Sequence, residues 1–288
     1  MISFVGAGPG APDLITLRGA ARLAKADVVV WAGSLVPEGV LGHCRPGVEL
    51  HDSATMTLED VIDVYAAHTE ETRIVRLHSG DPAVYGAIAE QMDWCLAESR
   101  SFEIVPGVSS VGAAAAALAR ELTIPGVSQS VVLTRLAGRT ATSMPEGARG
   151  MGGVPPTAAA GAAKEGVAAF APHGATMAVF LSAARPDELA AELLTPGSGY
   201  GPDTPAAVVV RASWPDEQIV RTTVGRLAAD LRATGATMTA LVLVGEALAD
   251  RPVVQRSHLY EPSFTTAYRL RSSTGSTAGR PSARRHDS

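Results

Sequence analysis

Short apolar runs that lead into glycine-containing loops recur through the first 121 residues, and they constrain the fold of this chain more than any other feature. Each run is continuously apolar rather than alternating, and segments with helical spacing lie between the runs. This pattern is typical of strands in a mainly parallel sheet, because helices cover both faces of such a sheet. It predicts an α/β domain over residues 1–121. The predicted strands are Ile2–Val5, Asp27–Trp31, Arg73–Leu77 and Phe102–Val105.

A second set of apolar runs follows residues 122–128, where Pro125 and Gly126 interrupt the pattern and predict a linker. The later runs predict a second α/β domain over residues 129–262. The strands are not spaced evenly enough for an eightfold barrel, so two α/β domains with mainly parallel or mixed sheets are favoured. Residues 143–163 are rich in Gly, Ala and Pro and are predicted to form a mobile loop. Residues 271–288 are predicted to be a disordered tail.

The composition excludes several classes of protein. Hydrophobic residues make up 46% of the 288 residues and charged residues 18%, which is a globular balance. The formal net charge is −5 and the basic residues form no clustered face, so a nucleic-acid partner is not expected. The longest apolar run, Gly112–Ala119, is too short to span a membrane, and no signal peptide is recognisable. Neither the two cysteines nor the histidines have a metal-ligand spacing. We therefore expect a cytoplasmic protein without a metal site.

The first glycine motif, Gly6-Ala7-Gly8-Pro9-Gly10-Ala11, directly follows a predicted strand. It matches the G-x-G-x-x-A form of a dinucleotide-binding loop, so an NAD-dependent oxidoreductase is a competing interpretation. A dinucleotide site also needs an acidic residue after the second strand, and this strand ends in Trp31-Ala32-Gly33-Ser34 instead. A tight turn without a ligand is equally compatible with the motif alone.

Two further loops follow predicted strands, at Ser79-Gly80-Asp81-Pro82 and at Pro106-Gly107-Val108-Ser109-Ser110. Ligands bind at the carboxyl edge of parallel sheets, so three such loops at one edge predict a binding site. Asp81 precedes a proline, which favours extended geometry and can present its carboxylate outward. An Asx turn that caps the next helix would explain Asp81 as well. Ser109 is predicted to cap a helix, and His78 is the one histidine beside a binding loop.

Taken together, the three loops resemble the signatures of the tetrapyrrole (corrin/porphyrin) methyltransferases. The segments at Gln129–Arg135, Gly138–Thr140 and Gly174–Ser182 resemble the branch of that family that methylates C11 of precorrin-4 or cobalt-precorrin-4. The resemblance implies an enzyme that transfers methyl from S-adenosyl-L-methionine and produces precorrin-5 in cobalamin biosynthesis. It also implies a homodimer and an active-site cleft between the two domains.

The resemblance implies a cofactor site built from both domains. Its expected residues are Pro9, Ser79, Gly80, Asp81, Val84, Ser109, Ser110, Leu181, Ala212, Thr239 and Ala240. Methyl transfer from a sulfonium is an in-line displacement that needs no metal and no covalent nucleophile, so positioning supplies much of the rate. Asp81 is the candidate for orienting the cofactor.

The substrate carries several carboxylates, which arginine binds bidentately. Arg120, Arg135 and Arg139 are the candidate substrate clamps, and Arg135 and Arg139 join Asp81 as candidate catalytic residues. Three alternatives stay open: a uroporphyrinogen-III or precorrin-3 methyltransferase of the same family, an NAD-dependent oxidoreductase, and a nucleotide-binding module without catalysis.

Overall fold

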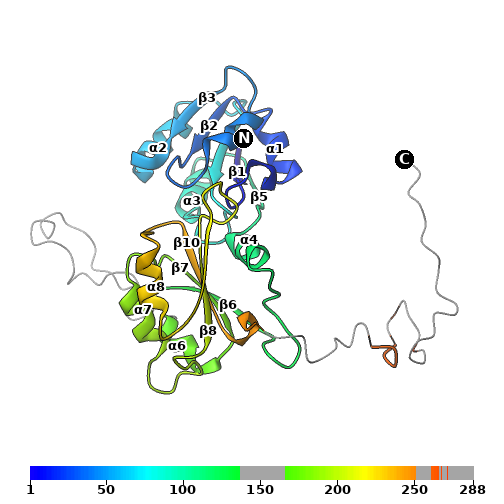
Figure 1. Ribbon diagram of the computed structural model, residues 1–288. Helices are drawn as coiled ribbons and strands as arrows, with labels where there is room; N and C mark the ends of the chain where they lie inside the picture. Colours follow the sequence, from blue (N-terminus) through cyan, green and yellow to red (C-terminus); the bar gives the residue numbers. More distant parts are fainter. Residues whose placement is uncertain (137–165, 251–260, 266, 268–270, 272–288) are drawn as a thin grey trace, which may run out of the picture.

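Two five-stranded sheets organise the chain, one formed before residue 106 and one formed after residue 130 (Figure 1). The computed structural model describes residues 1–136, 166–250, 261–265, 267 and 271. The predicted α/β class with two sheets is confirmed. The predicted loop at 143–163 and all of the predicted tail except residue 271 lie outside the described residues. The division into domains at residues 121–129 stays a prediction.

The first sheet is parallel throughout and has the strand order β3-β2-β4-β1-β5. Four of its strands were expected from the apolar runs, with ends that differ by one residue at most. The fifth, β3, is missing from the prediction because its sequence Glu-Leu-His-Asp is polar and mostly exposed at the sheet edge. The strands are β1 (Ile2–Gly6), β2 (Val28–Trp31), β3 (Glu49–Asp52), β4 (Ile74–His78) and β5 (Phe102–Val105).

Helices cover both faces of the first sheet, which explains why its central strands are continuously apolar. Helix α1 (Leu17–Leu23) and the 3-10 helix η2 (Glu38–His43) lie on one face, over a core that includes Val5, Val29 and Leu77. Helices α2 (Leu58–Ala66) and α3 (Ala89–Ala97) cover the other face. Two shorter 3-10 helices complete this half: η1 (Pro12–Leu14) and η3 (Ser53–Thr55).

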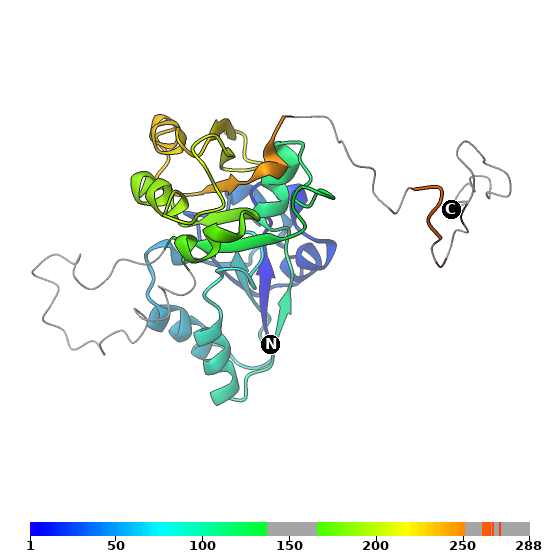
Figure 2. The same ribbon diagram turned by 90° about the horizontal axis from the view of Figure 1, so that it is seen from below.

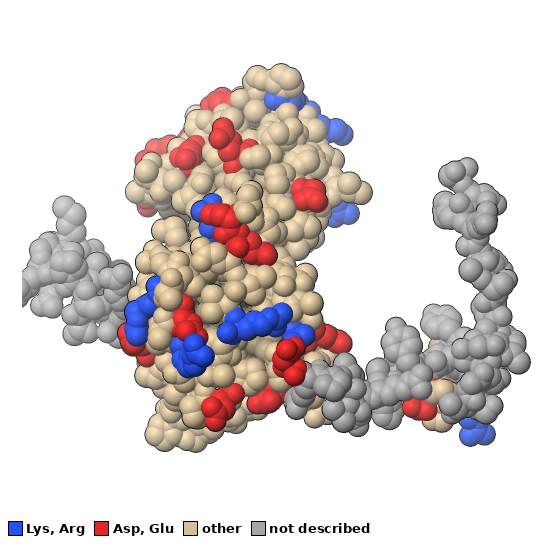
Figure 3. Space-filling view, viewed as in Figure 1, with Lys and Arg blue, Asp and Glu red and all other residues tan. Residues whose placement is uncertain are grey.

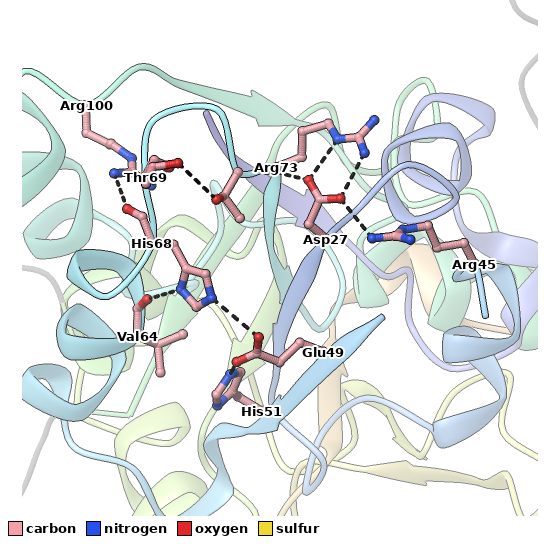
Figure 4. A network of polar contacts seen from close by, with 10 residues as sticks. Asp27, Arg45, Glu49, His51, Val64, His68, Thr69, Arg73 and Arg100 are labelled. Atoms are coloured by element: carbon pink, nitrogen blue, oxygen red, sulfur yellow. Dashed lines mark hydrogen bonds and ion pairs between the residues drawn. The ribbon is translucent and has the colours of Figure 1, made fainter. Parts of the chain in front are cut away.

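Ion pairs and hydrogen bonds tie together the amino ends of the strands in this sheet (Figure 4). Asp27 accepts hydrogen bonds from Arg45 and Arg73, and its hydrogen bonds with Arg73 hold the pKa of the Asp27 carboxyl far below its usual range. Glu49, which begins β3, contacts His51 at 2.6 Å and His68 at 3.4 Å. These charged groups are therefore paired at the edge opposite the glycine loops.

The second sheet is mixed and has the order β6-β7-β10-β8-β9. Strands β6 and β7 are parallel, whereas β10 runs antiparallel to both of its neighbours, and β9 runs antiparallel to β8. The strands are β6 (Val131–Arg135), β7 (Thr176–Phe180), β8 (Pro205–Val210), β9 (Gln218–Thr223) and β10 (Ala240–Val244). The predicted mixture of parallel and antiparallel pairs is confirmed.

One face of the second sheet is covered by a helix that precedes it in the chain. Helix α4 (Ser110–Ala117) follows β5, yet Ala114 and the adjacent Leu118 pack against residues of the second sheet such as Leu243. Figure 2 looks at the molecule from the end that carries this sheet. The other face is covered by α6 (Val167–Phe170), α7 (Pro186–Leu193) and α8 (Leu227–Ala233), with η6 (Ala171–His173) as a short connection. The 3-10 helix η7 (Glu246–Leu248) follows β10, and its Leu248 packs on the α4 side.

The outer surface carries both signs of charge. On the face shown in Figure 3, basic side chains stand in small groups beside acidic ones, without a large basic patch. Within the described ranges, every helix falls short of the length and apolar character that a membrane span requires.

Candidate active site

Three glycine loops meet at the carboxyl edge of the first sheet, because β4, β1 and β5 are neighbours in it. The first and second loops pair through their backbones, with the amide of Gly80 donating to the carbonyl of Gly8 at 2.8 Å. The first and third loops touch so closely that a Cβ on Gly6 would lie 2.5 Å from the Cα of Gly107. The glycines thus allow the loops to pack on one another.

Asp81 connects the second loop to the third. Its Oδ1 accepts a hydrogen bond from the amide of Ala83 at 2.8 Å, which forms an Asx turn. The expectation that this turn caps the next helix was wrong, because α3 begins only at Ala89. Its Oδ2 accepts one from the amide of Gly107 at 3.1 Å. Asp81 therefore has a structural task at the site, and it also borders the cavity described below.

The second sheet presents three chain segments to the same place. Leu181 follows β7, Arg211 and Ala212 follow β8, and Thr239 precedes β10. Because β10 runs antiparallel to β7 and β8, its beginning lies beside their ends. The amide of Arg211 donates to the carbonyl of Thr239 at 2.8 Å and joins two of these segments.

These segments and the glycine loops enclose a cavity of about 330 Å³. All eleven residues predicted to bind the cofactor line it, although they come from six separate segments of the chain: Pro9, Ser79, Gly80, Asp81, Val84, Ser109, Ser110, Leu181, Ala212, Thr239 and Ala240. Ser109 caps α4 as predicted, with its Oγ accepting from the amide of Val111 at 3.3 Å. The structure brings the predicted residues together; their binding of a cofactor stays a prediction.

Ten more residues line the cavity that the sequence did not indicate: Leu35, Tyr85, Phe180, Ala183, Val209, Arg211, Trp214, Thr237, Met238 and Leu241. Arg211 and Trp214 lie in a loop after an apolar strand, which is the signal that identified the other loops. The rings of Tyr85 and Phe180 are 4.9 Å apart and connect the two sheets at the cavity. No local pattern indicated that contact.

Left-handed backbone conformations are concentrated around this cavity. Four non-glycine residues in its wall have φ between 51° and 58°: Tyr85, Leu181, Arg211 and Thr239. Such conformations cost of order 1–3 kcal/mol each and persist where the surrounding structure enforces them, typically at functional sites. The strain supports the cavity as the functional site of the molecule.

The candidate clamp arginines are placed differently from the cofactor residues. Arg120 forms an ion pair with Asp250, and its Nε donates to the carbonyl of Leu248. Arg135 ends β6 and is exposed. Neither is in the cavity wall, and Arg139 lies outside the described residues. Among the described residues of the wall, Arg211 is the basic one.

Burial raises the pKa of Tyr85, and the nearby charge of Arg135 opposes this shift.

His78 is buried behind the site and does not line the cavity. Burial, followed by the charge of Arg76, lowers the pKa of His78 to about 3. In the unfolded chain His78 gains a proton as the pH falls below about 6.5, whereas in the folded protein it stays neutral down to about pH 3. The stability that depends on neutral His78 is therefore fully present above pH 6.5 and is lost progressively below it. We expect the free energy of unfolding to fall as the pH drops from 6.5 toward 3, with a contribution of up to about 1.4 kcal/mol per pH unit from this residue.

Urea unfolding of the wild type and His78→Asn between pH 7.5 and 5 measures this contribution. The variant is expected to have a shallower dependence on pH, whatever its absolute stability. His173→Asn, which changes an exposed histidine, is the matched control. Equal slopes for the wild type and His78→Asn would contradict the prediction.

Most of the chain is similar to known proteins of one family. The family model of the tetrapyrrole (corrin/porphyrin) methylases matches residues 1–228. The cobalt-precorrin-4 C(11)-methyltransferase of Methanocaldococcus jannaschii is 43% identical over 269 residues, which are 93% of this chain and 95% of that protein.

Two solved structures share the fold. The X-ray structure of a cobalt precorrin-4 methyltransferase, a cobalamin biosynthetic enzyme, has a TM-score of 0.74 and 42% identity, and covers 86% of this chain and 95% of its own. The uroporphyrin-III C-methyl transferase from Thermus thermophilus, complexed with S-adenyl homocysteine, has a TM-score of 0.64 and 28% identity, covering 86% and 98%.

Proposed function

This chain belongs to the tetrapyrrole (corrin/porphyrin) methylase family, and on that premise we propose that it methylates C11 of precorrin-4, giving precorrin-5 in cobalamin biosynthesis, with S-adenosyl-L-methionine as the methyl donor. The observation that carries the proposal is the cavity that joins both sheets, which is lined by every residue expected to bind the cofactor. Similarity to the precorrin-4 enzymes exceeds similarity to the uroporphyrin-III enzyme, which favours C11 chemistry.

The residues of the cavity suit the proposed cofactor. The carboxylate of Asp81 can pair with the cofactor's ammonium or accept from its ribose hydroxyls. The amino end of α4, capped by Ser109, offers backbone N–H groups to a carboxylate. Val84, Leu181 and Met238 supply apolar surface for a planar base. S-adenosylmethionine brings an electrophilic methyl group on a sulfonium, and an electron-rich carbon displaces it without a metal.

The role left to the protein is to hold the two reactants in line and to exclude water. The first and second glycine loops close one side of the cavity, and the segments after β7 and β8 close the other. In-line geometry of this kind supplies a large part of the rate in bimolecular reactions. Asp81 serves this role by fixing the loops against each other through its two hydrogen bonds.

The rim of the cavity suits a large macrocycle. Leu181 and Met238 line the cavity and are still 64% and 61% exposed, and Tyr85 is 45% exposed. Exposed apolar groups beside a cavity are typical of ligand-binding surfaces. We propose that the macrocycle covers them and that Arg135 and Arg139 bind its carboxylates. Arg120 is the weaker candidate, because its guanidinium is paired with Asp250.

The G-x-G-x-x-A loop has a different physical basis from a dinucleotide site. Gly8 has φ 82°, and a Cβ there would lie 2.7 Å from the carbonyl oxygen of Leu14. A Cβ on Gly6 would collide with Gly107 of the third loop. The chain then enters η1, a 3-10 helix, instead of an α-helix aimed at a pyrophosphate. These features support methyl transfer over the NAD-dependent oxidoreductase.

The test is incubation with precorrin-4 and S-adenosylmethionine labelled in its methyl group. We expect one label per tetrapyrrole, with NMR placing it at C11. Uroporphyrinogen III and precorrin-3 are offered as alternative methyl acceptors, and NADH is added as a competitor for the cofactor site. Label on one of the other tetrapyrroles alone would assign the chain to another branch of the family. Saturable cofactor binding without transfer to any of them would instead identify a binding module.

The resemblance to the family supports two further proposals, a homodimeric state and a cytoplasmic location, without a nucleic-acid or membrane partner. Sedimentation equilibrium of the full chain measures the first, and a monomer at micromolar concentration would contradict it. Fractionation of cells that produce the chain measures the second.

A further inference from the structure

The loop between β8 and β9 reaches from the second sheet to the first glycine loop. Trp214 Nε1 donates a hydrogen bond to the carbonyl of Pro9 at 2.9 Å. The amide of Ala11 donates to Ser213 Oγ at 3.0 Å. These bonds join residues about two hundred positions apart, and Pro9 and Trp214 both line the cavity. We call residues 211–217 the Trp214 latch.

Contacts within the Trp214 latch hold the indole ring in place. The guanidinium carbon of Arg211 lies 4.1 Å from the centre of the Trp214 ring, and its Nη1 is 3.0 Å from Asp216 Oδ2. The amide of Ser213 donates to Glu217 Oε2 at 2.6 Å. Arg211 and Ser213 adopt left-handed φ values of 51° and 66°. The latch therefore has a defined conformation that is maintained against backbone strain.

The indole ring of Trp214 packs directly against Gly10 of the first glycine loop. A Cβ there would lie 2.1 Å from Trp214 Cδ1 and 2.5 Å from Nε1, closer than real contacts allow. Gly8 in the same loop has a left-handed φ, but Gly10 does not, so its backbone would accept another residue. The ring, together with the carbonyl of Ala212 at 3.0 Å, is what requires a glycine at position 10.

We propose that Trp214 is a positioning residue that assembles the cofactor cavity from its two halves. With its ring seated at Gly10, it holds Pro9 of the first half and Arg211 of the second in one wall, and it slows the departure of the bound cofactor. The identity of that cofactor rests on the proposed function. The assignment of Trp214, Gly10 and Arg211 to this task rests on the contacts above.

The first experiment measures S-adenosylhomocysteine binding to Trp214→Phe and Trp214→Leu. The Phe variant keeps an aromatic ring beside Arg211 but loses the donor to Pro9, so we expect its dissociation constant to rise up to about tenfold. The Leu variant loses both contacts, and we expect a rise of about 100-fold, mostly in the dissociation rate. The KM for S-adenosylmethionine should rise in parallel, with kcat at saturation changed much less.

The matched control is Trp94→Phe. Trp94 lies on α3 against Tyr65, with ring centres 5.9 Å apart, and it does not line the cavity. It should leave the dissociation constant unchanged. If the Trp214 variants bind S-adenosylhomocysteine as the wild type does, the inference is wrong, even if their thermal stability has fallen.

The second experiment tests the contact between the Trp214 ring and Gly10. Gly10→Ala should weaken binding about as strongly as Trp214→Leu, because the methyl group displaces the ring. In the Trp214→Leu background the same change should cost much less, since the ring is gone and only the carbonyl of Ala212 remains close to the added methyl group. A full additional loss in the double variant would mean that Gly10 acts on the ligand directly and would overturn the inference. A wild type that does not bind S-adenosylhomocysteine would overturn the proposed cofactor itself, and with it the role of the latch.

Discussion

Gly107→Ala is expected to abolish S-adenosylhomocysteine binding and to destabilise the fold by about 3 kcal/mol, at the upper end of the usual cost of overpacking. The added Cβ would lie 2.0 Å from the carbonyl oxygen of Gly80 and 2.7 Å from the Cα of Gly6. Both are backbone atoms, so no side chain can rotate away. The three glycine loops would have to separate, and the amide of Gly107 would leave Asp81. Calorimetry and urea unfolding measure the two effects.

Gly112→Ala is the matched control for this substitution. Gly112 lies in α4, five residues away, and a Cβ there meets nothing within 4 Å. Replacing a helical glycine with alanine stabilises by up to about 1 kcal/mol. We expect slightly higher stability and unchanged affinity. Wild-type binding by Gly107→Ala would show that the loops do not need their close contact.

Asp81→Asn is expected to weaken S-adenosylhomocysteine binding by about 10- to 100-fold and to reduce methyl transfer at least as much. Each carboxylate oxygen of Asp81 accepts from a different backbone amide, Ala83 at one end and Gly107 at the other. An asparagine has one acceptor oxygen, so its NH₂ must face one of these N–H groups. Loss of a hydrogen bond to a charged group costs about 1.5–3 kcal/mol. Binding calorimetry and the labelled-methyl assay measure the result.

Asp52 offers a contrasting control, because a single carboxylate oxygen accepts both of its backbone hydrogen bonds. Its Oδ1 accepts from the amides of Gly33 and Ala54, both at 2.9 Å, and it does not line the cavity. These two backbone hydrogen bonds lower the pKa of the Asp52 carboxyl. Asp52→Asn keeps one acceptor oxygen for both amides, so it should change stability less than Asp81→Asn and leave cofactor affinity unchanged. Equal losses of affinity in both variants would assign Asp81 a purely structural role.

The sequence predicted the strands of the first sheet well, because burial on both faces leaves a continuous apolar run such as Val28–Trp31. It did not predict β3, since an exposed edge strand needs no apolar residues. The meeting of the three glycine loops was predictable because each follows a strand of one parallel sheet. The cofactor residues from the second half, such as Leu181 and Ala212, were expected only from the resemblance to the family.

Contacts between distant segments could not be predicted. Nothing near Gly10 in the chain indicates that Trp214 lies against it, so the reason for that glycine became visible only in the structure. The same holds for the ring contact of Tyr85 with Phe180. For Arg120, proximity to a predicted loop suggested a place in the cleft, whereas its contacts are with Leu248 and Asp250.

Helix α4 has a practical consequence for dividing this protein. By sequence it belongs to the first half, but Ala114 and Leu118 are buried by the second sheet. A fragment that began at residue 122 would leave apolar side chains such as Ala207 and Leu243 uncovered, and we expect it to aggregate. A fragment that began at Pro106 would keep the helix that covers them. The second half of the chain thus needs residues 106–121, which precede the predicted linker, before it can exist as an independent unit.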